Sequence, residues 1–233
     1  VHLARLHDGT DVVVKVQHLD IEKTINEDLE IMAGLATLAE HIPDFAVWRP
    51  PVIVEQLSRS LRRELNFSRE LQHLILFRKQ YGHLDNVCIP AAFPELSTPR
   101  VLTMEYLRGT SVSSLSKTNT ATENGKPTHG SDLATSGKLQ DSIDDRHRQE
   151  MARTAAELYV EMIFIHGVYH ADPHPGNILV MEGNRLGLLD FGMVGRIDDR
   201  LRETIEEMLL AVISQDAAVL TSLIKRVGNT PPR

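Results

Sequence analysis

Apolar and polar residues alternate at the start of the chain and then give way to helical spacing. Residues 1–6 and 11–16 read as β-strands, and the Asp8-Gly9 pair between them is a hairpin signal. From Ile21 to about Glu40 apolar residues recur every three or four positions, which predicts a helix. The same spacing predicts one long helix from about Val52 to Gln80, with its leucines, Leu57 among them, facing the core.

The rest of the chain is predicted to be mainly helical around short strands. The strands are expected at 87–92, 100–106, 178–181 and 186–189, and the helices at about 144–166, 199–214 and 216–227. Residues 116–142 differ in kind, because Ser, Thr, Asn, Gly and Asp dominate there and large apolar side chains are nearly absent. This composition predicts a flexible insertion.

Composition sets the class of protein. With 233 residues, 42% of them hydrophobic, the chain can form one large domain or two lobes. A net charge of -7 argues against a nucleic-acid surface, and the single cysteine, Cys88, fits a reducing compartment. No signal peptide and no apolar stretch of about 20 residues occurs in this chain. We therefore expect a cytoplasmic location, or one peripheral to the inner face of a membrane.

Two short segments carry the residue types of a phosphate-transfer site. Residues 170–177 read HADPHPGN and residues 190–192 read DFG. The first holds Asp172 and Asn177 five residues apart, and Asp190 opens the second. Carboxylate and amide oxygens can hold Mg²⁺ on nucleotide phosphates, and a loop Asp can orient an attacking hydroxyl. Asp172 is therefore the candidate base, and Asn177 and Asp190 are the candidate metal ligands.

Lys15 follows three valines at the end of the second predicted strand. Alone, such a lysine is usually a solvated surface residue, but the downstream acidic residues favour a role in binding the α- and β-phosphates. A helix Glu would then hold it, and Glu55, Glu64 and Glu70 are the candidates. The alternative is that all three are surface charges paired with arginines at helical spacing.

The same loop has a second interpretation as a transition-metal site. His166, His170 and His174 are spaced by four, which would align three imidazoles on a helix. Pro173 and Pro175 break any helix there, so that alignment fails. We expect His170 to hold the loop by hydrogen bonds instead.

Residues 104–107 follow a predicted strand in the position of a kinase hinge. The backbone groups of Glu105 and Leu107 would meet the adenine edge of a nucleotide, with Met104 behind it. Taken alone, the segment is an ordinary strand end, so this interpretation depends on the other motifs.

Together, these motifs resemble the UbiB-type (aarF-like) atypical kinases, a family tied to ubiquinone biosynthesis. HADPHPGNILV at 170–180 and LLDFGMVGRI at 188–197 are close to the family signature, and VVVKVQ at 12–17 agrees with it. The resemblance covers nearly the whole chain outside the insertion. It implies an α+β, protein-kinase-like fold with two lobes: a small N-lobe (1–107) with an antiparallel sheet and helices, and a larger, mainly helical C-lobe (108–233).

The resemblance also implies roles for single residues. Glu70 would pair with Lys15 in the nucleotide-bound state, and Glu64 would belong to a regulatory motif of the family. Asn66 stands in that motif where the family has Asp, which removes a negative charge. The family's Ala-rich nucleotide loop would lie just before Val1, and a Lys-x-Gly-Gln extension further upstream, so we expect this chain to be part of a longer protein.

The implied function is Mg²⁺-dependent transfer of the γ-phosphoryl group of ATP to water or to a hydroxyl acceptor. The absence of an Ala-Pro-Glu segment after Gly192 argues against protein substrates. Isoprenoid lipids or quinone-pathway proteins are the implied partners, with membrane association through regions outside this chain. Two alternatives stay open: a small-molecule phosphotransferase of the aminoglycoside or choline kinase type, and a nucleotide-binding pseudokinase scaffold.

Overall fold

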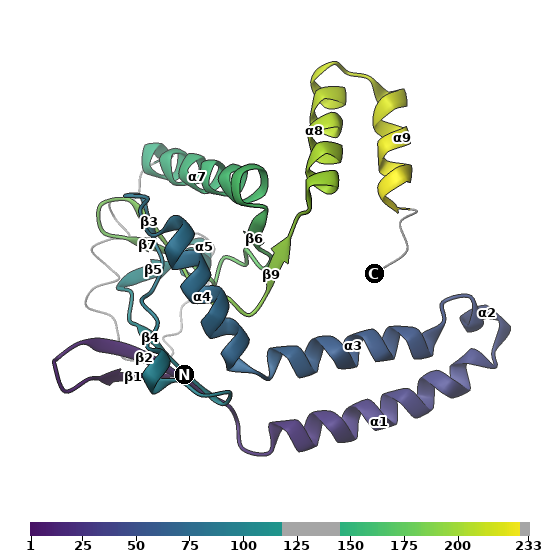
Figure 1. The fold of residues 1–233 in the computed structure, drawn as a ribbon, viewed down its shortest axis with the longest axis horizontal. Helices are drawn as coiled ribbons and strands as arrows, with labels where there is room; N and C mark the ends of the chain where they lie inside the picture. Colours follow the sequence, from purple (N-terminus) through teal and green to yellow (C-terminus); the bar gives the residue numbers. More distant parts are fainter. Residues whose placement is uncertain (118–144, 229–233) are drawn as a thin grey trace.

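A computed structural model describes residues 1–117 and 145–228 (Figure 1). The first range contains β1 (His2–Arg5), β2 (Asp11–Val16), α1 (Ile21–Glu40), α2 (Pro43–Ala46), α3 (Pro50–Glu64), α4 (Phe67–Tyr81), β3 (Val87–Cys88), the 3-10 helix η1 (Pro94–Leu96), β4 (Val101–Glu105), β5 (Gly109–Ser111) and α5 (Val112–Lys117). The second contains α7 (Asp145–Val160), the π-helix η2 (Glu161–His166), β6 (Val168–His170), β7 (Ile178–Met181), β8 (Arg185–Leu188), β9 (Val194–Arg196), α8 (Asp199–Ile213) and α9 (Ala217–Gly228). The predicted insertion at 116–142 lies almost wholly outside the described residues.

Three small sheets position the loops of the molecule. The first, in the order β1-β2-β4, is antiparallel, as the sequence predicts for the N-terminal part, and it places Lys15 opposite Leu102. The second has the order β3-β8-β7-β5, and its β7–β8 hairpin ends just before Asp190. The third pairs β6 with β9, so that His170 lies opposite Val194. This last pairing brings the loop after β6 beside the segment that follows Asp190.

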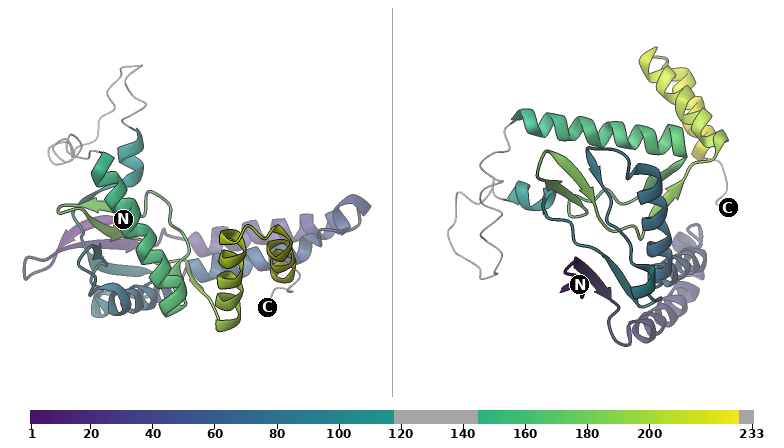
Figure 2. Two further views of the ribbon diagram at one scale, coloured as in Figure 1. Left: turned by 90° about the horizontal axis from the view of Figure 1, so that it is seen from above. Right: turned by 60° about the vertical axis from the view of Figure 1, so that its left-hand side comes forward.

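The core lies between α4, the π-helix and the segment after β8. Leu74, Phe77 and Tyr81 line one face of α4, and they pack with Met162 and Phe191 in one fully buried cluster. Figure 2 shows α7 running across one side of the strands and α4 along another. α4 is therefore the element that joins the first sheet to the second half of the chain.

The predicted helix from Val52 to Gln80 is wrong as a single helix, because the chain breaks between α3 and α4. Asn66 has extended backbone angles (φ -106, ψ 98), and its side chain accepts a hydrogen bond from the Ser68 N–H. The Phe67 N–H donates to the Pro99 carbonyl at 2.9 Å, which fixes the turn against the loop before β4. Leu57, predicted to be buried, is exposed on α3, where α1 and α3 form a projecting hairpin (Figure 1).

Several other predicted helices and strands differ from the structure in their bounds. The strand expected at 87–92 shortens to the two residues of β3. The helix expected at 144–166 becomes α7 followed by the π-helix η2. The strands β5, β6 and β9 were not predicted, because three residues are too few to show an alternating pattern.

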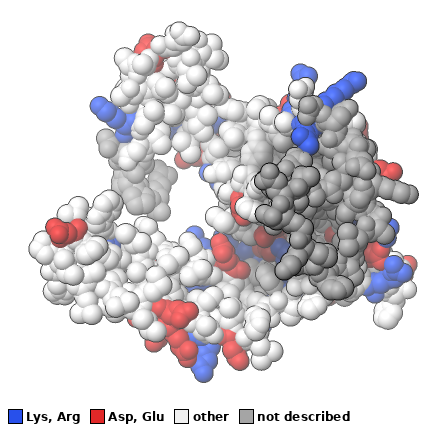
Figure 3. Space-filling view, turned by 180° about the vertical axis from the view of Figure 1, so that it is seen from behind, with Lys and Arg blue, Asp and Glu red and all other residues white. Residues whose placement is uncertain are grey.

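Charged side chains on the face drawn in Figure 3 lie in small, separated groups. The molecule also has ion pairs at helical spacing between well-exposed partners, such as Glu55 with Arg59 on α3 and Glu150 with Arg146 on α7. Exposed pairs of this kind contribute about 0.5 kcal/mol or less each. Such pairs therefore add little to the stability of the fold.

The cap at Asn66 gives a first prediction. Replacing Asn66 by Ala removes the acceptor for the Ser68 N–H and is expected to lower the free energy of unfolding by about 1 kcal/mol. Asn66→Asp keeps an acceptor of the same reach and is expected to leave it within a few tenths of a kcal/mol. Urea denaturation of the two variants measures both. An Asp variant as unstable as the Ala variant would contradict a capping role.

Candidate active site

Lys15 meets two carboxylates contributed by distant parts of the chain. Its Nζ lies 2.5 Å from Glu70 Oε1 on α4 and 3.7 Å from Asp190 Oδ1 after β8. The side chains of Glu70 and Lys15 are 7% and 15% exposed, whereas that of Asp190 is 49% exposed. The ammonium thus sits between a buried carboxylate and one that is open to solvent.

Of the three candidate glutamates, the structure brings only Glu70 to Lys15. Glu55 is exposed and pairs with Arg59, as the surface-charge alternative predicts for it. Glu64 is exposed at the last position of α3, before the break. Glu70 is buried because it begins the face of α4 that packs on the core.

The Asp190-Phe191-Gly192 turn is held in a specific backbone conformation. Asp190 adopts a left-handed φ of 57°, which is uncommon for a residue other than glycine. The Phe191 ring is fully buried, and its N–H donates to Glu70 Oε1 at 3.3 Å. The Gly192 N–H donates to Asp190 Oδ1 at 3.2 Å, and a Cβ on Gly192 would lie equally close to that oxygen. A side chain at position 192 would therefore press on the Asp190 carboxylate, which would have to move by a few tenths of an ångström.

Asp172 and Asn177 face each other across their loop. Asn177 Nδ2 donates to Asp172 Oδ2 at 3.1 Å and contacts the Asp172 carbonyl at 3.4 Å. Because the amide nitrogen is engaged here, Oδ1 of Asn177 is the atom that could bind a cation. The Leu189 N–H donates to the Asn177 carbonyl at 2.8 Å. This bond fixes the loop to the residue directly before Asp190.

His170 holds the loop, as the sequence predicts. The ring is 1% exposed, its Nδ1 accepts from the Asp172 N–H at 3.3 Å, and its Nε2 contacts the Leu189 carbonyl at 3.0 Å. A carbonyl only accepts, so the proton is on Nε2 and the imidazole is neutral. Both ring nitrogens are engaged in the scaffold, and His166 lies apart from it against Glu161 at 3.4 Å.

Tyr159 supports the same loop from α7. Its hydroxyl donates to the His170 carbonyl at 3.1 Å. Burial, with a smaller contribution from the charge of Asp172, raises the pKa of Tyr159 to about 12. The phenol is therefore a neutral hydrogen-bond donor at neutral pH.

The shifted pKa of Tyr159 predicts alkaline behaviour. In the unfolded chain a tyrosine loses its proton near pH 10, while the folded state keeps it to about pH 12. Between these values the unfolded state binds fewer protons, so stability falls as the pH rises. Tyr159→Phe is expected to show a smaller fall between pH 10 and pH 12 in urea denaturation, with the exposed Tyr106→Phe as control. Equal slopes for wild type and Tyr159→Phe would contradict this.

The three residues expected at the hinge lie at the end of β4. Met104 is buried in the core. The Glu105 carboxylate accepts from the Ala91 N–H at 2.9 Å and pairs with Arg78 at 3.3 Å. A pocket of about 360 Å³ is lined by Glu105 and Leu107 but not by Lys15 or the residues around it. The adenine contacts of Glu105 and Leu107 therefore stay a prediction.

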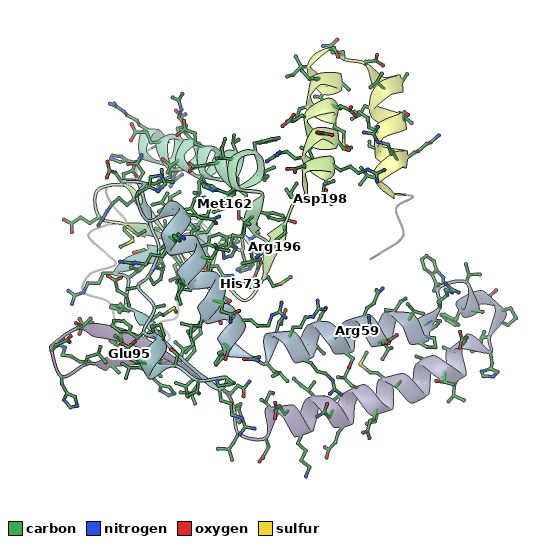
Figure 4. The ribbon with its side chains drawn as sticks, in the orientation of Figure 1. Arg59, His73, Glu95, Met162, Arg196 and Asp198 are labelled. Atoms are coloured by element: carbon green, nitrogen blue, oxygen red, sulfur yellow. The ribbon has the colours of Figure 1, made fainter. Side chains whose placement is uncertain are left out.

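Two residues at the site, Tyr159 and His73, are not predicted from the sequence. His73 on α4 contacts the Phe191 carbonyl through Nδ1 at 2.8 Å. Figure 4 places His73 on α4 beside the loop that leads into β9. It lies one helical turn after Glu70, but this spacing alone does not distinguish it from the other polar residues of α4.

A comparison with known protein families identifies the family to which this chain belongs. The profile of the family described as ABC1 atypical kinase-like domain matches residues 1–224, which include every site residue named above. The chain belongs to the ABC1 atypical kinase-like family. The resemblance to UbiB-type kinases inferred from the motifs is thereby confirmed.

Relatives of the ABC1 family match along the whole chain. The protein ACTIVITY OF BC1 COMPLEX KINASE 8, chloroplastic, of Arabidopsis thaliana is 30% identical over 100% of this chain and 28% of its own length. An uncharacterised Synechocystis protein is 30% identical over 98% of this chain and 35% of its own length. The chain thus spans about a third of the length of these relatives.

A solved structure shares the fold. The Mycobacterium tuberculosis protein Rv3197, solved in complex with erythromycin, superimposes with a TM-score of 0.69 at 20% identity, over all of this chain and 53% of that one. At this identity the likeness concerns the fold alone. It agrees with a mixed α/β, kinase-like architecture containing antiparallel sheets.

The donor set of this ABC1-family site suits a hard cation. Asp190 offers a half-exposed carboxylate, Asn177 an amide oxygen, and Asp172 a carboxylate with one oxygen engaged by Asn177. Mg²⁺ prefers such oxygens and usually keeps waters and substrate phosphates in its shell. The residues present therefore fit Mg²⁺ bound together with a nucleotide.

Two further sequence predictions concern Asn66 and the membrane. Asn66 lies outside the Lys15 cluster and caps α4, the helix that carries Glu70, so any regulatory role of Glu64 and Asn66 stays a prediction. Of the helices within residues 1–117 and 145–228, none has the length and hydropathy needed to cross a bilayer.

Proposed function

We propose that this chain is the nucleotide-binding core of a UbiB-type atypical kinase, which binds Mg·ATP and transfers its γ-phosphoryl group to water or a hydroxyl acceptor. The observation that carries the proposal is the position of Lys15 between Glu70 and Asp190, at 2.5 Å and 3.7 Å. A lysine fixed by a helix glutamate and facing a second, solvent-open carboxylate is the arrangement that phosphoryl transfer in kinases requires.

Each residue of the cluster has a distinct part in this proposal. Lys15 neutralises the α- and β-phosphates, and Glu70 fixes the direction of the ammonium through their ion pair. Asn177 and Asp190 would hold Mg²⁺, which would offset the charge of the phosphates. Asp172 orients the acceptor and takes the proton of its hydroxyl on the carboxylate oxygen that Asn177 does not engage.

The nucleotide would lie between the two proposed lobes, residues 1–107 and 108–233. Its adenine would meet the backbone of Glu105 and Leu107, with Met104 behind it. The antiparallel pairing of β2 with β4 supports this arrangement, because it sets Lys15 and the end of β4 on one three-stranded sheet.

The pathway is proposed on the family alone. The UbiB resemblance connects the chain to isoprenoid quinone biosynthesis, and isoprenoid lipids or quinone-pathway proteins are the proposed partners. The name of the Arabidopsis relative refers to activity of the bc1 complex. A location at the inner face of a membrane would follow from such partners.

Phosphate release from Mg·ATP tests the proposed chemistry. Lys15→Met is expected to lower the turnover rate about a hundredfold, because the phosphates lose their positioned cation. Lys23→Met is the matched control, since Lys23 lies exposed on α1 beside Glu27. ATP binding without release would favour the pseudokinase alternative, and rapid turnover with amino-alcohol acceptors would favour the small-molecule phosphotransferase. Equal rates for wild type and Lys15→Met would overturn the assignment of Lys15.

A further inference from the structure

We propose that His73 is a positioning residue that, together with Glu70, clamps the Asp-Phe-Gly turn to α4 and so sets the direction of the metal-binding carboxylate of Asp190. The inference rests on the proposed function, because it assigns a purpose to Asp190. It adds a residue that neither the motif pattern nor the comparisons indicate.

The clamp holds Phe191 from both of its peptide units. On the amino side, the Phe191 N–H donates to Glu70 Oε1 at 3.3 Å. On the carboxyl side, the Phe191 carbonyl accepts from His73 Nδ1 at 2.8 Å. Because a carbonyl only accepts, Nδ1 must carry a proton, and it does so in the Nδ1-protonated neutral ring as well as in the charged ring.

Both partners of Phe191 come from one face of α4. Glu70, His73 and Phe77 follow each other at intervals of three and four residues, which places them on the same side of the helix (Figure 4 labels His73). The Phe77 ring packs against the Phe191 ring with centroids 5.2 Å apart. The His170 ring meets Phe191 from the opposite loop at 5.5 Å. The side chain and both peptide units of Phe191 are thus fixed, and within residues 1–117 and 145–228 the partners of its backbone groups both lie on α4.

The orientation of these two peptide units determines the backbone conformation of Asp190 and the direction of its carboxylate. The unit between Asp190 and Phe191 is the one whose N–H meets Glu70, and its plane determines ψ of Asp190. The next unit, whose carbonyl meets His73, carries the Gly192 N–H that donates to Asp190 Oδ1 at 3.2 Å. Asp190 also has a φ of 57°, where an ordinary residue needs support from its surroundings. Without the hydrogen bond from His73, the second peptide unit could rotate, and the Asp190 carboxylate bonded to its N–H would lose its fixed direction.

A pair of substitutions separates this role from simple packing. His73→Leu removes the donor but keeps an apolar side chain of similar reach. His73→Asn keeps a donor, because the amide Nδ2 of Asn is as many bonds from the backbone as Nδ1 of His. His83→Leu, at an exposed histidine beyond the end of α4, is the matched control.

The test is the Mg²⁺ concentration that gives half-maximal stabilisation by ATP, measured by thermal shift at fixed ATP. His73→Leu is expected to raise this concentration about tenfold, the effect of one lost hydrogen bond on the metal ligand. ATP affinity without metal is expected to change less than about twofold, because Lys15 and Glu70 are intact. His73→Asn is expected to recover most of the metal dependence, and His83→Leu is expected to match wild type. Should the Leu variant fail to fold, His73→Ala replaces it in the comparison with His73→Asn.

The possible outcomes are distinguishable. A tenfold shift in the Leu variant that Asn reverses supports the clamp. A Leu variant with wild-type metal dependence overturns the inference and leaves the proposed nucleotide site intact. An equal loss of metal-dependent and metal-free binding in the Leu variant also overturns it, since this would show a general structural defect. Wild-type protein that binds no nucleotide overturns the proposed function and this inference together.

Discussion

Replacing Asp190 by Asn is expected to lower the rate of phosphoryl transfer at least about a hundredfold while leaving the fold intact. The substitution removes the charge that holds the metal, and a metal at a phosphoryl centre contributes several kcal/mol to the transition state. Asn tolerates the left-handed φ of 57°, and its Oδ1 can still accept from the Gly192 N–H. The free energy of unfolding is therefore expected to change little, because the side chain is half-exposed.

Asp198 provides the matched control for this charge removal. It lies shortly after Asp190 and caps α8, where its Oδ1 accepts from the Leu201 N–H at 2.8 Å (Figure 4). Asn caps helices as well as Asp does, so Asp198→Asn is expected to keep both stability and activity. Wild-type activity in Asp190→Asn would show that this carboxylate does not hold a catalytic metal.

Replacing Glu70 by Ala is expected to destabilise the protein by about 3 kcal/mol, the largest effect on stability expected at the site. The change leaves the Lys15 ammonium, which is only 15% exposed, without its buried partner. It also leaves the Phe191 N–H without its acceptor. Asp190 at 3.7 Å offsets part of the loss, which keeps the expected value at the lower end for a broken buried ion pair.

Glu55→Ala is the control for Glu70→Ala, because it removes an exposed ion pair instead of a buried one. Glu55 forms an exposed ion pair with Arg59 on α3, labelled in Figure 4, and its loss is expected to cost about 0.5 kcal/mol or less. Urea denaturation of both variants measures the difference. Equal losses would mean that the Lys15–Glu70 pair contributes no more than a surface pair, contrary to its burial.

The residues that meet around Lys15 and Asp172 were easier to find from the sequence than the bounds of the helices. Lys15, Asp172, Asn177 and Asp190 could be found because each is a polar residue of a specific type beside a strong local pattern. The choice of Glu70 over Glu55 and Glu64 came from the family resemblance. Periodicity alone gave no preference, since all three glutamates lie on one apparently continuous apolar pattern.

That pattern also concealed the break at Asn66. Leucines recur at short intervals on both sides of residues 65–66, at 57, 61 and 65 and again at 71, 74 and 76, so the apolar pattern predicts one helix. The break depends on a bond from Phe67 to the Pro99 carbonyl, a contact over more than thirty residues that no local pattern contains. Asn66 itself was a usable local signal, because Asn is a strong helix N-cap.

The backbone contacts of His73 and Tyr159 could not be predicted from any motif. The roles of His73 and Tyr159 consist of hydrogen bonds to the carbonyls of Phe191 and His170, and backbone carbonyls are present at every position of a sequence. The pairing of β6 with β9 rests on three residues in each strand. These features follow from tertiary packing around α4 and not from any motif.

The most direct test of the account is a thermal-shift titration of the wild-type chain with ATP and ADP, with and without Mg²⁺. A ligand that binds only the folded state at about a hundred times its Kd adds about 2.7 kcal/mol, or on the order of 5–10 °C for a chain of this size. We expect a larger shift with Mg²⁺ than without it, and this excess is expected to be lost in Asp190→Asn. A shift of equal size without metal, or an unchanged shift in Asp190→Asn, would contradict the assignment of Asp190 to the metal, and no shift with either nucleotide would contradict the nucleotide site of this chain.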